Sequence, residues 1–253
     1  QYNNIESVKK LFKLYHNKVA AVILEPMWLD YPNESFLHEL KELAHKNNAL
    51  LIFDEVLTGF RLANGGGQEL LKIDADLSAF GKAIGNGMPL GAITGKEEYM
   101  KEFKNVFYST TYGGEALSLA AGNAVVDEYL DKPVIKHCWE MGQLLKDNFN
   151  KISSELKLDA KWNGLPVRGS IEFLDQEGNN KNSLKSLFLQ ECIKNNVLLG
   201  QGEVLLCYSH KIRDIKNTIT IFEKALGVVS TAIQKNNVLE KLEGKEIKSV
   251  MTF

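Results

Sequence analysis

The sequence has only three cysteines among its 253 residues. Cys138, Cys192 and Cys207 are widely spaced and odd in number, so they form neither a disulfide framework nor a metal-binding pattern. We therefore assign no metal site. Such cysteines are typical of buried thiols in a reducing compartment, and we expect a cytoplasmic protein.

Long apolar runs, strong net charge and nucleotide-binding glycine motifs are also missing. No apolar run reaches the ~18 to 20 residues that a membrane helix needs. The formal net charge is −2, which gives no electrostatic reason to expect nucleic acid or an anionic membrane as a partner. The motif GxxxxGK(S/T) is absent, which excludes a P-loop, and no GxGxxG follows the first expected strand, so a dinucleotide-binding fold has little support.

Apolar segments alternate with helical patterns in the first half of the chain. VAAVILEP and NALLIFDE are continuous apolar runs, typical of strands buried on both faces of a parallel sheet. Between them, Asn33 or Ser35 can cap an amphipathic helix that begins near Phe36. Four strands are expected, at 19–26, 48–55, 75–80 and 90–95. This order predicts an α/β fold with a mostly parallel sheet.

A helical stretch from Glu115 to Leu130 ends at Asp131-Lys132-Pro133, and Pro133 can open the next helix. We place the domain boundary there, with domains at 1–131 and 132–253. The second half predicts a small α+β domain. Its expected elements are strands at 167–173, 197–200 and 204–209, a polar turn at 175–182, a helix to about Asn195 and a last long helix with one apolar stripe.

Two acids, Asp54 and Glu55, end the second strand. A carboxylate at the carboxyl end of a buried parallel strand lies where open α/β sheets bind their ligands. Alternatively, both acids only end the strand and cap the next segment of the chain.

Lys82 follows a short apolar strand and precedes a stretch that contains Gly85, Gly87 and Gly91. Glycines permit tight turns and a close approach of the backbone to a ligand. A lysine in such a segment is a candidate Schiff-base nucleophile, activated by desolvation or neighbouring charge. A solvated surface lysine and a phosphate-binding lysine are the alternatives.

Four segments in this order resemble a known family: Glu25-Pro26, FDEVLTGFR (53–61), DLSAFGKAIGNGMPLGAITG (76–95) and STTYGGEALSLAAGNA (109–124). The family is the class III, ornithine and ω-amino acid type, of aminotransferases that depend on pyridoxal 5'-phosphate (PLP). The resemblance implies the fold-type-I architecture, with a partial large domain that binds PLP followed by a small C-terminal domain.

The resemblance also implies roles for individual residues. Lys82 would hold PLP as an internal aldimine and move a proton during amino transfer. Asp54 would make a charge-assisted hydrogen bond to the pyridine nitrogen and so keep the ring an electron sink. Val56, on the same side of an extended strand as Asp54, would pack against the ring face, unless it is an ordinary core valine.

Thr111 matches the family threonine that reaches the cofactor phosphate of the other subunit, so we expect a homodimer with shared active sites. The neighbouring Thr110 and a plain helix cap are the alternatives. The family usually continues with Gly-Asn-Pro where this chain has Gly114-Glu115-Ala116. This departure slightly favours an aminotransferase that acts on a small amino compound or amino acid. The alternatives are an aminomutase, which moves the amino group within glutamate 1-semialdehyde, and a non-catalytic fragment.

The family's phosphate-binding loop and ring-stacking aromatic have no convincing match in this sequence, which begins at Gln1. We therefore expect the chain to be the C-terminal part of a class III enzyme. Activity is expected of the intact protein or a complemented assembly rather than of this piece alone.

Overall fold

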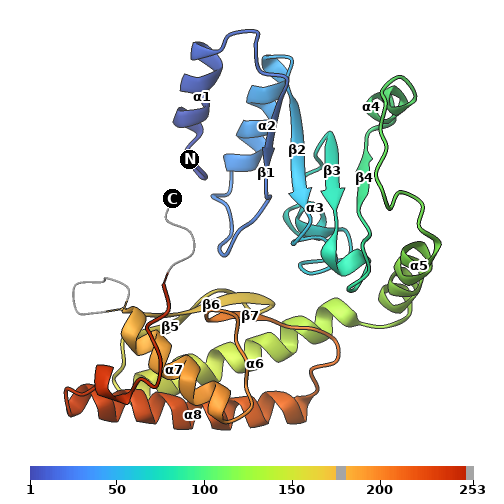
Figure 1. Cartoon of the computed structure of the whole chain (residues 1–253). Coiled ribbons are helices and arrows are strands. Elements are labelled where there is room, and N and C mark those ends of the chain that lie inside the picture. The colour runs from blue at the N-terminus through green and yellow to red at the C-terminus, as the bar shows by residue number, and fades with distance from the viewer. Residues whose placement is uncertain (175–180, 249–253) are drawn as a thin grey trace. The chain divides into compact units, whose positions relative to one another are not determined.

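A four-stranded sheet forms the centre of Gln1–Ile135, the first of two compact units; the second is Lys136–Phe253. The structure is a computed structural model that describes residues 1–174 and 181–248. The sheet has the order β1 (Ala21–Leu24), β2 (Leu50–Glu55), β3 (Leu77–Phe80), β4 (Ala92–Gly95) (Figure 1). The first three strands are parallel and β4 is antiparallel to β3. The prediction of an α/β fold with a mostly parallel sheet is confirmed.

The described part of this unit contains five helices, of which the first two pack on one face of the sheet. They are α1 (Ile5–Leu14), α2 (Phe36–Lys46), α3 (Gly66–Leu71), α4 (Glu97–Met100) and α5 (Ala116–Asp131), with short 3₁₀ turns η1 (Lys82–Ile84) and η2 (Lys101–Lys104). Residues Phe36 and Leu40 of α2 are buried in one cluster with Leu51 and Phe53 of β2. The Ser35 side chain makes no cap hydrogen bond with α2, so that detail of the prediction is wrong.

The opposite face of the sheet is open among the described residues. Because side chains alternate along a strand, Ile52 and Asp54 lie on the face opposite Leu51 and Phe53. The cross-strand register adds further apolar side chains to it: Ile23, Leu77, Ala79 and Ile93. Ile23 is 65% exposed. The prediction that the first two strands are buried on both faces therefore does not hold within the described chain, because no described helix packs over this second face.

The second unit is a small α+β fold. Its antiparallel sheet has the order β5 (Ala160–Leu165), β6 (Arg168–Phe173), β7 (Glu203–Leu205). The helices are α6 (Val134–Glu155), which begins at the end of the first unit, α7 (Asn182–Lys194) and α8 (Ile212–Gln234), followed by the turn η3 (Leu239–Lys241). Phe149, Phe188 and Phe222 meet in its core with ring centroids 5.4–5.8 Å apart.

Two strand predictions fail in this unit. Residues 197–200 form no strand, and only Gly200 makes an isolated bridge, to Glu203. Strand β5 was not predicted. The expected polar turn at 175–182 falls largely outside the described residues. No helix in the described part of the chain is long and apolar enough to cross a membrane.

Candidate functional site

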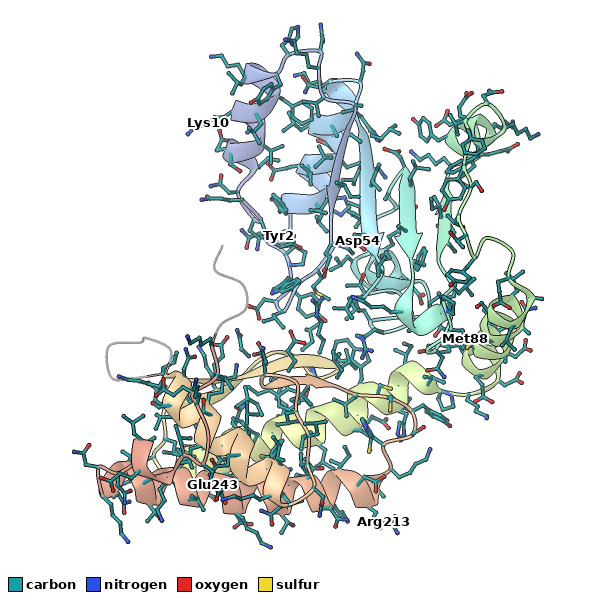
Figure 2. All side chains as sticks on the ribbon, viewed as in Figure 1. Tyr2, Lys10, Asp54, Met88, Arg213 and Glu243 are labelled. Carbon is teal, nitrogen blue, oxygen red and sulfur yellow. The ribbon has the colours of Figure 1, made fainter. Side chains whose placement is uncertain are left out.

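The carboxyl ends of β2 and β3 bring Asp54 and Lys82 to the same edge of the sheet. Asp54 is in register with Ala79 on the neighbouring strand, and Lys82 follows Ala79 after Phe80 and Gly81. With strands about 4.8 Å apart and a rise of about 3.3 Å per residue, the two Cα atoms are on the order of 10 Å apart. Figure 2 shows Asp54 at this end of β2 and Met88 on the loop that follows Lys82. A small ligand can therefore contact both side chains.

The Asp54 carboxylate lies half-buried on the open face of the sheet. Its Oδ1 atom accepts a hydrogen bond of 3.0 Å from the backbone N–H of Val56. Among the described residues, no donor bonds to Oδ2, so one oxygen remains able to accept a hydrogen bond from a ligand.

Glu55 points to the other side of the strand and is completely buried. Its carboxylate accepts hydrogen bonds from the N–H groups of Gly67 (2.8 Å) and Gln68 (2.9 Å) and from the Thr58 hydroxyl. These donors belong to the first turn of α3 and the loop before it, so Glu55 satisfies helix N–H groups that have no intrahelical partner. The capping interpretation is right for Glu55, whereas the hydrogen bond of Asp54 is to the Val56 N–H, which belongs to no helix.

Lys82 has an unusual backbone conformation, with φ +47° at the start of η1. This left-handed region costs a residue with a Cβ on the order of 1 kcal/mol. The side chain is exposed. No carboxylate or hydrogen-bond acceptor binds its amino group within the described residues, so the Nζ atom is available to a ligand.

Packing against α5 holds the Lys82 turn in place. A Cβ on Gly122 of α5 would lie 2.5 Å from Leu90 Cδ2 and 3.7 Å from the carbonyl oxygen of Ile84, so only glycine permits this approach. On the strand side, the Phe60 ring meets the Tyr129 ring edge-on at 5.3 Å, and the Tyr129 hydroxyl donates to the Phe60 carbonyl at 2.5 Å. No local sequence pattern indicated these contacts, because their partners lie far apart in the chain.

The other candidate residues are not all gathered at this edge. Val56 lies beside Gly81, next to the lysine. Thr111 lies in an exposed turn before α5, and no hydrogen bond in the described chain links it to Asp54, Val56 or Lys82. The described residues contain no group of three or more His, Cys, Asp or Glu side chains able to hold a metal ion.

Glu115 is the N-cap of α5. Its carboxylate accepts hydrogen bonds from the N–H groups of Leu117 (2.8 Å) and Ser118 (2.7 Å) and from the Ser118 hydroxyl (2.6 Å). The bond from the Ser118 hydroxyl, followed by those from the backbone, lowers the pKa of Glu115. The departure at Gly114-Glu115-Ala116 therefore has a local structural cause and does not distinguish between substrates.

Comparison with known proteins identifies the family. Residues 1–227 match the family model described as aminotransferase class-III. The chain belongs to this family. One class-III relative is a glutamate-1-semialdehyde 2,1-aminomutase of Alkaliphilus oremlandii (strain OhILAs), which is 35% identical over 247 residues that cover 89% of this chain and 56% of the relative.

Solved structures share the fold of this chain. The FumI protein of Sphingopyxis sp. MTA144, solved in its PLP internal aldimine form, has a TM-score of 0.87 at 22% identity, covering 92% of this chain and 57% of that one. A β-phenylalanine aminotransferase from Variovorax paradoxus has a TM-score of 0.80 at 25% identity, covering 91% and 57%. The chain thus spans little more than half the length of these class-III proteins.

Proposed function

We propose that this chain is the lysine-bearing part of a PLP-dependent enzyme that transfers amino groups, with Lys82 as the lysine that binds the cofactor. One observation carries the proposal. Within the described residues, an Asp54 carboxylate with one oxygen that accepts no hydrogen bond and a Lys82 amino group without an acceptor lie at the carboxyl ends of adjacent parallel strands, where open α/β sheets bind ligands.

The donor set of this edge fits PLP. When bound, PLP supplies an electrophilic aldehyde and a ring that stabilises negative charge on the neighbouring carbon. Asp54 would accept a hydrogen bond from the protonated ring nitrogen and favour that protonation state. The Lys82 Nζ atom would bind the aldehyde carbon and, once a substrate amine has displaced it, move a proton at the substrate Cα atom. Val56 would offer an apolar surface to the ring.

The reaction is either amino transfer between two small amino compounds or the intramolecular transfer of an aminomutase. The slight preference for an aminotransferase rested on Gly114-Glu115-Ala116, which the helix cap now explains. The similarity to the glutamate-1-semialdehyde aminomutase of A. oremlandii favours the second reaction. We therefore take glutamate 1-semialdehyde as the first substrate to test.

A homodimer is proposed because α5 and the segment before it expose apolar side chains. Leu117 and Leu130 of α5 are 64% and 75% exposed, and Phe107 is 97% exposed. Exposed apolar side chains in number mark a candidate interaction site. A second copy of the protein would cover it, and Thr111 in the same segment would contact the partner's cofactor phosphate.

The two compact units suggest a domain assignment. We propose that the unit around β1–β4 belongs to the PLP-binding large domain and that the second unit is the C-terminal small domain, with the boundary near 131–135. Polypeptide outside residues 1–253 is proposed to cover the open sheet face, because Ile23 and Ile93 are otherwise in contact with water. Three cysteines without a disulfide are in keeping with a cytoplasmic location.

The experiment uses the intact protein that contains this chain, loaded with PLP. Borohydride reduction followed by peptide mapping is expected to find the cofactor on the Lys82 peptide, and Lys82→Ala is expected to abolish this attachment. Cofactor fixed on another lysine, or on none, contradicts the proposal. Product formation from glutamate 1-semialdehyde without a second substrate indicates the aminomutase, whereas dependence on a separate amino donor and acceptor indicates the aminotransferase.

A further inference from the structure

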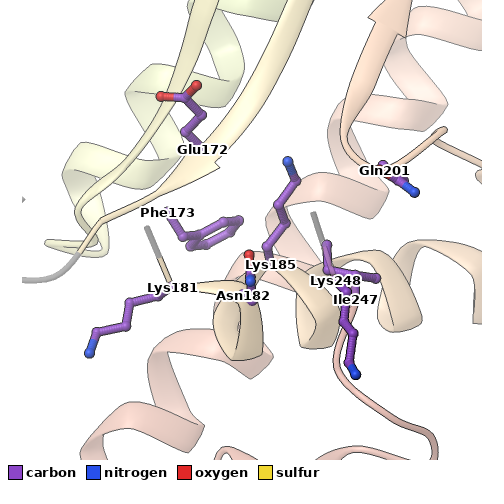
Figure 3. Close-up of a pocket in the computed structure, with 8 residues that line it drawn as sticks. All are labelled: Glu172, Phe173, Lys181, Asn182, Lys185, Gln201, Ile247 and Lys248. Carbon is purple, nitrogen blue, oxygen red and sulfur yellow. The ribbon is translucent and has the colours of Figure 1, made fainter. Parts of the chain in front are cut away.

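The second unit contains a cavity of about 240 Å³ that lies within this unit alone. Residues of four segments line it (Figure 3): Glu172 and Phe173 of β6, Lys181, Asn182 and Lys185 at the start of α7, Gln201 of a loop, and Ile247 and Lys248 of the tail. Three of the eight side chains are lysines and one is a glutamate, so the lining carries a positive net charge.

Lys185 is the lysine that enters the cavity. In Figure 3 its side chain rises between Phe173 and the tail residues, whereas the amino groups of Lys181 and Lys248 point away. The side chain lies against Gly202, where φ is +88° and an added Cβ would lie 3.0 Å from the Lys185 Nζ atom. The left-handed φ at Gly202 favours glycine, and the Lys185 side chain lies over it.

The Lys185 ammonium has no counter-ion at bonding distance among residues 1–174 and 181–248. No carboxylate or other acceptor binds its Nζ atom in the part of the chain that the structure describes. Burial lowers the pKa of Lys185, and the more distant charges of Glu172 and Glu203 only partly oppose this effect. A half-buried ammonium without a partner is unfavourable, and an anion in the cavity would relieve this cost.

The first turn of α7 adds a second source of positive potential. Its N-cap residue, Lys181, gives no side-chain cap hydrogen bond. The first N–H groups of this 13-residue helix therefore lack an intrahelical partner, and they lie at the positive end of the helix dipole. The Asn182 side chain, which lines the cavity, belongs to this turn.

The C-terminal tail forms one wall of the cavity. The backbone N–H of Ile247 donates to the Ser186 hydroxyl at 2.9 Å, and that of Glu243 donates to the Gln190 side chain at 2.8 Å. Glu243 also pairs with Lys194 at 2.5 Å. These bonds hold the tail along α7. The class-III match ends at residue 227, so this wall lies beyond the part that the family model describes.

We propose that this cavity binds a small polyvalent oxyanion, of the phosphate or dicarboxylate kind, with Lys185 as its main charge partner and Asn182 and Gln201 as hydrogen-bond donors. Glu172 lies at the rim, where its carboxylate accepts a hydrogen bond of 3.2 Å from the Asn163 amide. Its charge reduces the positive potential of the cavity, and its hydrogen bond to Asn163 holds the carboxylate on that side chain.

The test is titration calorimetry on the intact protein already loaded with PLP, so that the cofactor's own phosphate site is filled. Inorganic phosphate and succinate are the two probes. Lys185→Met should weaken the binding of the preferred probe about tenfold or more, as expected for the loss of a charged hydrogen bond. Lys224→Met, which removes an exposed lysine of α8 in the same unit, is the matched control and should bind as the wild type does.

Binding of only one probe identifies which kind of oxyanion the site takes. Gln201→Ala leaves Lys185 intact and should weaken binding about threefold, which keeps the test decisive if Lys185→Met does not fold. Equal affinity of the wild type and both cavity variants overturns the proposal, as does the absence of saturable binding up to roughly 10 mM of either probe. Neither result bears on Lys82, because the titrated protein keeps its PLP.

Discussion

Val56 packs directly against Gly81, the residue immediately before Lys82. A Cβ placed on Gly81 would lie 3.2 Å from Val56 Cγ1 and 3.6 Å from Cγ2. The φ angle of Gly81 is −164°, an extended conformation that any residue adopts, so the requirement for glycine here is steric. The strand that carries Asp54 and the turn that carries Lys82 are thus positioned by one contact.

Gly81→Ala is expected to displace the Lys82 turn, because the new methyl group and Val56 must move apart by a few tenths of an ångström. We expect a loss of about 1 kcal/mol in the free energy of unfolding and weaker PLP attachment to Lys82. Val56→Ala provides the missing space, so the double variant should regain most of both losses. Urea unfolding and PLP titration of the four proteins give the coupling energy, and a value of zero would show that this contact does not position the turn.

Acid is expected to destabilise the first unit through Asp76, at the opposite end of the sheet from Lys82. This completely buried carboxylate accepts hydrogen bonds from Lys96 Nζ (2.6 Å), the Leu51 N–H (2.8 Å) and His45 Nε2 (2.8 Å). Burial raises the pKa of Asp76, but these bonds outweigh it, so its pKa is lowered in the folded protein. The unfolded chain then binds the proton more readily, and stability is lost as the pH falls below about 4.

Asp76→Asn should remove this part of the pH dependence and cost about 2 kcal/mol at neutral pH, because the amide leaves one acceptor oxygen for the buried Leu51 N–H and the two side-chain donors. The measurement is the free energy of unfolding in urea at about pH 6 and about pH 3. Asp74→Asn changes a neighbouring exposed acid and should leave the difference between the two values as it is in the wild type. If Asp76→Asn shows the same difference in the free energy of unfolding between the two pH values as the wild type, a group other than Asp76 causes the loss of stability in acid.

The edge that holds Asp54 and Lys82 could be predicted from the sequence, because both residues follow apolar runs that end at the same side of a parallel sheet. The sequence could not show which of Asp54 and Glu55 faces the ligand and which caps a helix. The two acids are neighbours in one strand, and only the N–H groups of Gly67 and Gln68, far along the chain, show which of them is a cap. Such contacts depend on the path of the loop between β2 and α3, and no local sequence pattern predicts that path.

The strand errors have a similar cause. Strand β5, with the sequence AKWNGL, lacks β-branched residues, and Gly164 within it has φ +93°, so local propensity argues against a strand. Pairing with β6 along its whole length overrides that propensity. Residues 197–200 have the opposite character, because they are apolar but are paired only through Gly200. The sequence did not predict the Lys185 cavity either, because its walls come from four separate segments.

The exposed face of α5 is expected to be the dimer interface of the intact protein. Leu117→Asp places a charge on this face, and near a helix N-terminus an acid does not weaken the helix itself. We expect the dimer dissociation constant to rise about thirtyfold, as for a central interface side chain, measured by analytical ultracentrifugation. Leu198→Asp is the control, because Leu198 is 83% exposed in the second unit. Equal dissociation constants for the two variants would place the interface elsewhere.

The neighbouring acids Asp54 and Glu55 should respond in opposite ways to the loss of their charge. Glu55→Gln keeps the shape but leaves one acceptor oxygen for three donors, so buried N–H or hydroxyl groups lose their partner and the free energy of unfolding should fall by about 3 kcal/mol.

Asp54→Asn loses no cap and should change stability by less than about 0.5 kcal/mol. Its turnover should fall by at least about a hundredfold, as when a single electrostatic partner of the reacting group is removed, while PLP stays attached to Lys82. Thermal unfolding and single-turnover kinetics on the PLP-loaded intact protein separate the two effects. A stable, fully active Asp54→Asn variant would remove Asp54 from the site, whatever the behaviour of Glu55→Gln.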